Sequence, residues 1–229
     1  MPKLKQVTVA DHDRLFFIRW MLLFVVANEA AGLPEVNRQR LHSLLFVSFA
    51  SSKFYKIAPL RQRARRSQHG PYYRMAHIAL GHLVMAGLVD VSGFSAYPEP
   101  RDLQFEGVFR PTRAGIKACK HLRMTMTGDR IYRFLLDMCL ASAESLVSDD
   151  AQADSQVLER TLEADLTYQR AVRKHGEILE LQDPSEEETP TVRGLHSINV
   201  HLQSVGFFNR RDVVAAYQVV LSRRAGASV

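Results

Sequence analysis

The chain has 229 residues, 46% hydrophobic and 24% charged, which excludes a wholly disordered protein and allows a sizeable hydrophobic core. Its two cysteines, Cys119 and Cys139, are too few for a disulfide framework and have no metal-ligand spacing, so we expect a reducing, cytoplasmic compartment. The net charge of +6 is uneven: residues 1–128 carry +11 (19 Lys/Arg against 8 Asp/Glu) and residues 129–229 carry −5 (11 against 16). A basic half joined to an acidic half indicates a module that faces a polyanion, and this module is joined to a region with a different role.

The first predicted element is an apolar helix within residues 1–34, centred on the stretch Leu15–Leu33. Its longest unbroken apolar run, Trp20–Ala27, is far shorter than the ~20 residues that a membrane span needs. Asp11 and Asp13, which precede it, do not fit a signal peptide but can cap a helix. We therefore expect a core helix or a dimer helix, and no membrane contact.

The next stretch is basic. Between Glu35 and Asp90 lie 54 residues with nine Lys/Arg and no acid, more than a solvated surface requires, which favours nucleic acid or another anionic partner. Helical spacing predicts one helix from about Glu35 to Ser51 and another over residues 71–88. Between them, residues 58–68 (APLRQRARRSQ) are expected to form a short helix or a basic loop.

The pattern changes after Gly87, which is expected to end the preceding helix. Residues 88–94 and 105–112 are predicted to be two short strands, joined by a turn-rich loop, and Thr112 is expected to cap a further helix. The chain thus divides into an N-terminal helix (1–34), a domain over residues 35–128 and an acidic helical extension over residues 129–229. Within the extension, helices are predicted at about 128–147, 156–181, 191–208 and 209–224, with Asn209 as the cap of the last one.

The order of elements in residues 38–123 resembles a winged helix-turn-helix domain. The stretch GPYYRMAHIALGHLVMAGLVDVS is similar to the recognition helix of the MarR/PadR-type regulators, and GVFRPTRAGIKACKHL to their second wing strand and the T-x-AG start of the next helix. The resemblance covers roughly 85 residues. It implies a mainly α protein with a small β-wing that binds double-stranded DNA as a transcription regulator. It also implies a homodimer, held here by residues from about 14–30 and 129–181.

In a helix-turn-helix, the second helix enters the major groove and the element before it follows the backbone. The arginine run before the 71–88 helix is therefore assigned to phosphates, and Arg74, with Tyr73 and His77 behind it, to possible base contacts. The wing carries Glu99, Asp102 and Glu106 with Arg101 as its one base. The predicted nucleic-acid-binding residues are Lys53, Lys56, Arg61, Arg63, Arg65, Arg66, Tyr72, Tyr73, Arg74, His77 and Arg101.

Less specific interpretations of the same residues stay open. The arginine run is also compatible with a disordered basic loop. Tyr72 and Tyr73 are also compatible with core positions, which the helical spacing favours for Tyr73, and His77 with a partly buried polar position.

The chain contains no nucleophile elbow, Walker lysine motif or G-x-G-x-x-G, so we expect no enzymatic activity, no cofactor and no metal site. The competing hypothesis is an adaptor: a winged-helix subunit of a larger DNA-associated complex that contains an ATPase, docked to its partner through the acidic C-terminal half. Its acidic second half and acidic wing favour that alternative.

Overall fold

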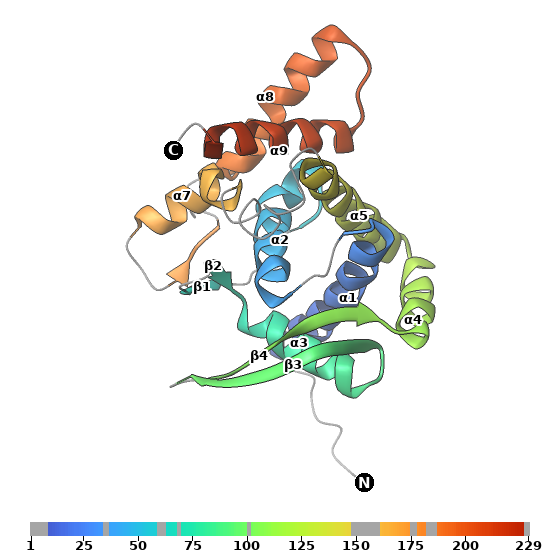
Figure 1. The fold of residues 1–229 in the computed structure, drawn as a ribbon. Helices are drawn as coiled ribbons and strands as arrows, with labels where there is room; N and C mark the ends of the chain where they lie inside the picture. Colours follow the sequence, from blue (N-terminus) through green and yellow to red (C-terminus); the bar gives the residue numbers. More distant parts are fainter. Residues whose placement is uncertain are drawn as a thin grey trace.

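The computed structural model describes residues 9–33, 37–58, 63–67, 70–99, 102–147, 161–174, 178–181 and 187–226. Figure 1 shows a mainly helical chain with two small antiparallel sheets, which agrees with the predicted mainly α class. The first half holds α1 (Val9–Ala30), α2 (Arg38–Ser51), the 3-10 turn η1 (Ser52–Tyr55), β1 (Ala64–Ser67), β2 (Gly70–Tyr72), α3 (Arg74–Met85), β3 (Val89–Glu99), β4 (Asp102–Pro111) and α4 (Arg113–Arg123). The second half holds α5 (Met126–Val147), α7 (Leu166–Arg173), β5 (Ile178–Leu179), α8 (Pro190–Val205) and α9 (Arg210–Gly226).

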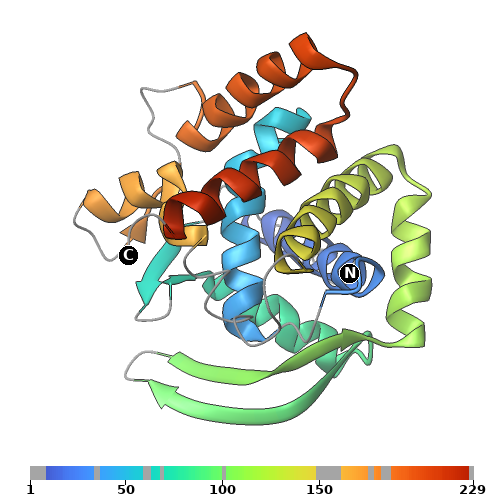
Figure 2. The ribbon, with the colours of Figure 1, turned by 45° about the horizontal axis from the view of Figure 1, so that its top comes forward.

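Helix α1 lies at the centre of the molecule, against α3, α4, α5 and β4 (Figure 2). Its residues from Trp20 to Ala27 are all buried, and Trp20 packs on Phe49 of α2 and Phe134 of α5, with ring centroids 5.6 and 6.2 Å apart. The apolar surface that suggested a dimer helix is therefore covered by the chain itself. The burial of this run agrees with the core-helix interpretation, and dimerisation through residues 14–30 and 129–181 stays a prediction.

The arginine run was expected to form a short helix or a loop, but part of it is a strand. Among the described residues, β1 is the middle strand of a three-stranded sheet, between β2 and β5. Arg65 is in register with Tyr72 of β2 and with Ile178 of β5, and both pairings are antiparallel. The pairing is possible because Ala64 and Leu179 are buried together on one face of the sheet, which gives this polar strand an apolar anchor.

The predicted wing is a long hairpin rather than two short strands and a loop. Strands β3 and β4 pair in register from Val89↔Pro111 to Glu99↔Asp102, with an irregularity between Ser92 and Ser95. Within the described part of the chain this sheet has two strands. β4 makes an isolated bridge to Asn37 at Val108, whereas β3 has an open edge, and Pro98 is tolerated there without breaking a ladder. The expectation of a turn-rich loop over 95–104 was wrong for that reason.

The corner between α3, the wing and α4 is built from the residues of the GLV and T-x-AG phrases. Gly87 has a left-handed backbone (φ 67°) and follows the end of α3, as predicted. Thr112 caps α4 by accepting a hydrogen bond from the Gly115 amide (3.1 Å) and donates its hydroxyl to the Gly87 carbonyl (2.7 Å). A Cβ at Gly115 would lie 2.0 Å from the Leu88 carbonyl oxygen, so only glycine lets α4 approach this closely.

The order of elements departs from a winged helix-turn-helix at one point. Directly before α3, where that motif has a helix, the described residues form β1 and β2. The two wing strands and the helices on either side occur in the expected order. The structure therefore shows a mainly α fold with small antiparallel sheets, and the winged helix-turn-helix stays a prediction.

The acidic half also differs from its prediction. A single helix over 156–181 was expected, but the chain breaks at Asp165, which caps α7 by accepting the Tyr168 amide (2.9 Å). Asp165 is fully buried and also accepts hydrogen bonds from Thr191 of α8 (2.7 Å) and Tyr217 of α9 (2.9 Å). This carboxylate ties α7, α8 and α9 together. The predicted Asn209 cap is present, accepting from the Asp212 amide (3.1 Å).

Candidate nucleic-acid interface

The arginines of the β1 region face solvent. The Arg63 side chain is 72% exposed and makes an ion pair with Glu180 at 3.7 Å, and an exposed pair of this kind holds the arginine only weakly. Arg65 and Arg66 follow it on β1 and are exposed too. Arg61, the fourth arginine of the predicted run, lies outside the described residues. Arg65 and Arg66 are therefore on a paired strand instead of a loop, and Arg63 directly precedes that strand.

Helix α3 starts beside this strand. β2, the neighbour of β1, ends at Tyr72, and the exposed Arg74 is the first residue of α3. The N-terminus of α3 has no side-chain cap and no acid in its first turn. A helix N-terminus carries a partial positive charge, which attracts phosphates. We call Arg63, Arg65, Arg66 and Arg74 the β1–α3 surface.

Tyr72, Tyr73 and His77 were predicted to lie near the bases, but the structure buries all three, with exposures of 5%, 1% and 4%. The cause is His42 of α2, whose ring stacks on Tyr73 and lies 5.1 Å from the ring of Tyr72. His42 Nδ1 also accepts the Tyr73 amide at 3.2 Å. Burial, with smaller contributions from Arg38 and His77, lowers the pKa of His42 to about 3, so the ring is neutral. These aromatic residues fix the angle between β2 and α3, and the base-contact assignment for Tyr72, Tyr73 and His77 is corrected to a core role.

Two of the remaining predicted residues, Lys53 and Lys56, do not join the β1–α3 surface. The Lys53 ammonium donates to the carbonyl of Glu187, just before α8. Lys56 is exposed, and its carbonyl accepts a hydrogen bond from Arg130 of α5. Arg101 lies outside the described residues. Lys53 and Lys56 therefore lie beside the C-terminal helices.

One acidic residue of the β3–β4 hairpin makes a contact within the chain. Glu106, which is half exposed, accepts a hydrogen bond from Arg38 of α2 at 3.4 Å. This ion pair ties the wing to α2. The acidic character of the wing, which counted against phosphate contact, therefore reflects in part a contact within the chain.

Sequence reasoning missed a second cationic face, on α4. Arg113, Lys117 and Lys120 are exposed at helical spacing, and α4 carries no acid. The opposite face of the helix is buried at Gly115 and Cys119. The signal was available in the stretch TRAGIKACKHLR, where every charged residue is basic. In both Figure 1 and Figure 2, α4 lies on the side of the molecule away from β1.

Two further properties bear on the site. Within the part of the chain that the structure describes, no cluster of three or more His, Cys, Asp or Glu side chains is arranged to bind a metal ion. In the same residues, no helix combines the length and the hydropathy that crossing a bilayer requires. In comparisons with known proteins, the chain matches no family model, no curated protein and no solved structure.

Proposed function

We propose that this protein binds double-stranded DNA through the β1–α3 surface and acts as a transcription regulator. The observation that carries the proposal is the position of the exposed Arg65 and Arg66 on a paired strand, with the exposed Arg63 directly before it, next to the uncapped N-terminus of α3. Within the described residues, Arg65 and Arg66 have no ion pair, and Arg63 has only the exposed one with Glu180. Phosphates bind where cations and backbone amides converge on a rigid support. The resemblance to winged helix-turn-helix regulators supports duplex DNA as the polyanion.

Different residues of the β1–α3 surface have different roles in binding DNA. Arg63, Arg65 and Arg66 contact phosphates, which supplies salt-dependent affinity without sequence preference. Arg74, on the first turn of α3, is the residue for a base edge, since arginine to guanine is the commonest specific contact. With Tyr72, Tyr73 and His77 buried, sequence preference rests on few side chains.

The test is duplex binding measured by fluorescence anisotropy across a salt series. We expect the Arg63→Ala/Arg65→Ala/Arg66→Ala variant to bind more weakly and to lower the salt slope by ~0.9 for each phosphate that the protein no longer neutralises. The matched control is Arg113→Ala/Lys117→Ala/Lys120→Ala on α4, which removes the same charge from a different side of the molecule. If the two variants bind equally weakly and with equal slopes, only net charge matters and the localised site is wrong. A larger effect in the α4 variant would move the interface to α4.

A regulator of this kind acts as a dimer, so that two recognition helices meet successive turns of DNA. Because Trp20–Ala27 of α1 is buried within one chain, we expect the dimer contacts to lie outside this run. Light scattering at micromolar concentration measures this directly. A clean monomer of 26.0 kDa would contradict the dimer.

The adaptor hypothesis gains one observation of its own. Val200 and Val205 on α8 and Phe207 in the turn that leads to α9 are 69%, 74% and 101% exposed, so this helical hairpin presents an apolar patch to solvent. Such a patch is typical of a protein-docking surface. Absence of duplex binding by the wild type at low salt would favour an adaptor that docks a partner protein through its C-terminal half.

A further inference from the structure

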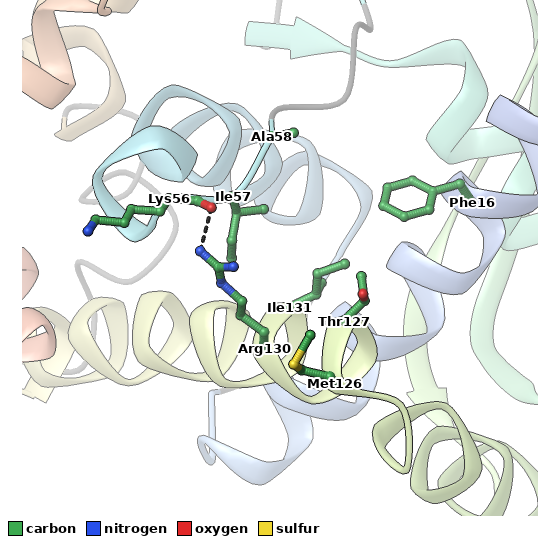
Figure 3. Close-up of a pocket in the computed structure, with 8 residues that line it drawn as sticks. All are labelled: Phe16, Lys56, Ile57, Ala58, Met126, Thr127, Arg130 and Ile131. Atoms are coloured by element: carbon green, nitrogen blue, oxygen red, sulfur yellow. Dashed lines mark hydrogen bonds between the residues drawn. The ribbon is translucent and has the colours of Figure 1, made fainter.

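A pocket of about 230 Å³ lies between α1, the segment after η1 and the first turns of α5 (Figure 3). Ile57 and Ile131, which are 8% and 6% exposed, and the half-buried Phe16 supply an apolar wall. The Met126 side chain, which is 88% exposed, stands at the rim. The volume is below the ~300–1,000 Å³ of sites for drug-sized ligands, so the pocket suits a small, largely apolar molecule.

One cation is fixed at this pocket. Arg130 of α5 donates from Nη2 to the carbonyls of Lys56 (2.5 Å) and Tyr55 (3.3 Å), and these two bonds hold its guanidinium in place. Its Nε and Nη1 groups donate to no described residue, and no described carboxylate pairs with its charge. In Figure 3 the Lys56 ammonium extends away from the other lining side chains, so Arg130 is the cation that faces them.

The backbone is strained at the same place. Lys56 has a left-handed conformation (φ 56°), which no other non-glycine residue in the described ranges adopts. A long side chain costs free energy in this conformation, and such residues cluster at ligand sites and switches. Here the conformation turns the Lys56 carbonyl toward Arg130, so the strained residue positions the guanidinium.

We propose that this pocket binds a small carboxylic acid with an apolar body, its carboxylate on Arg130 and its hydrocarbon part against Phe16, Ile57 and Ile131. A single fixed guanidinium matches a ligand with one negative charge, because a phosphate monoester needs more donors to offset its second charge. The apolar wall excludes a bare inorganic anion as the preferred ligand, since it would leave the wall in water. This site is separate from the β1–α3 surface and does not depend on DNA binding.

The site is tested by isothermal titration of the full chain with hexanoate, and with 1-hexanol as the neutral analogue of the same length. We expect one hexanoate per chain, with a dissociation constant of about 0.1–1 mM, as small ligands of this size allow. Hexanol should bind at least tenfold more weakly, because it cannot form the charge-assisted hydrogen bond. Trp20, the one tryptophan of the chain, lies 6.1 Å from Phe16 between ring centroids, so its fluorescence gives a second readout of the same binding.

Three variants separate recognition from folding. Arg130→Met should weaken hexanoate binding tenfold or more, and Thr127→Phe, which fills the pocket and keeps the charge, should abolish it. Arg133→Met is the matched control, because Arg133 lies on the same helix, pairs with Asp129 at 2.7 Å and does not line the pocket. Equal binding of hexanoate and hexanol, no hexanoate binding at ~10 mM, or an equally weakened Arg133→Met would each overturn the proposal. All these measurements omit DNA, so their outcome is independent of the proposed DNA function.

Discussion

Gly115 and Gly81 allow the same substitution to be made in two helices with opposite expected results. At Gly115, an alanine Cβ would lie 2.0 Å from the Leu88 carbonyl oxygen, a backbone atom that cannot rotate away. Overpacking of this kind costs ~2 kcal/mol. Moving α4 outward would also break the bonds from Thr112 to Gly87 and Leu88, at ~1 kcal/mol each. The higher helix propensity of alanine offsets ~1 kcal/mol of this loss, so Gly115→Ala should lower the free energy of unfolding by about 3 kcal/mol.

At Gly81, in the interior of α3, the added Cβ meets no atom within 4 Å. Only the propensity gain remains, so Gly81→Ala should stabilise the protein by ~0.5–1 kcal/mol. Urea unfolding followed by circular dichroism measures both changes, read from the midpoint with the slope unchanged. A Gly115→Ala variant as stable as the wild type would refute the close approach of α4 to Leu88.

Two further predictions concern buried polar contacts. His42 has a folded-state pKa of about 3, below its unfolded value near 6.5. The contribution of the neutral His42 to the free energy of unfolding is therefore complete above pH ~6.5, and it falls by ~1.4 kcal/mol per pH unit toward pH 3. His42→Asn, which keeps an acceptor for the Tyr73 amide, should lessen this acid sensitivity between pH 6 and 4 in urea titrations, and an unchanged slope would contradict the neutral buried ring. Thr189 donates to the Ala50 carbonyl (2.7 Å) and caps α8 at the Val192 amide, so Thr189→Val should lower stability by ~2 kcal/mol and Thr189→Ser by much less in the same assay.

The parts of the fold that the sequence predicted are those fixed by nearby residues. The Thr112 cap and the Gly87 stop depend on contacts within a few positions along the chain, or across one corner. Helical spacing likewise predicted a helix over residues 71–88, where α3 (Arg74–Met85) is found. Local chemistry and periodicity carry this information directly.

The parts that failed depend on contacts between distant residues. Ala64 pairs with Leu179, 115 positions later, and the four residues of β1 have no alternating pattern to reveal a strand. The wing was misjudged because Pro98 indicates a turn, whereas an open edge accommodates it. Asp165 broke the predicted long helix because of partners on α8 and α9, which no window of sequence contains.

The features of the candidate site also differ in whether they depend on a residue's own chemistry or on contacts with distant residues. The exposure of Arg63, Arg65 and Arg66 follows from their charge and was expected. The burial of Tyr72 and His77 was left open as an alternative to nucleic-acid contact, because it depends on His42 of another helix, which packs on Tyr72, while Tyr72 in turn packs on His77. The cationic face of α4 was not predicted, although the sequence of this helix contains basic residues and no acid.

The pairing of β5 with β1 has a consequence for synthesis of the chain. β1 and β2 leave the ribosome more than a hundred residues before β5, and in that interval the arginine strand has an open edge, a template for pairing with another chain. A product truncated after Lys174 would keep the arginines, lack Glu180 as their neighbour and leave that edge open permanently. The arginine strand therefore gains its second neighbour from the acidic half, and the sheet that carries the cationic surface is complete only after β5 has been made.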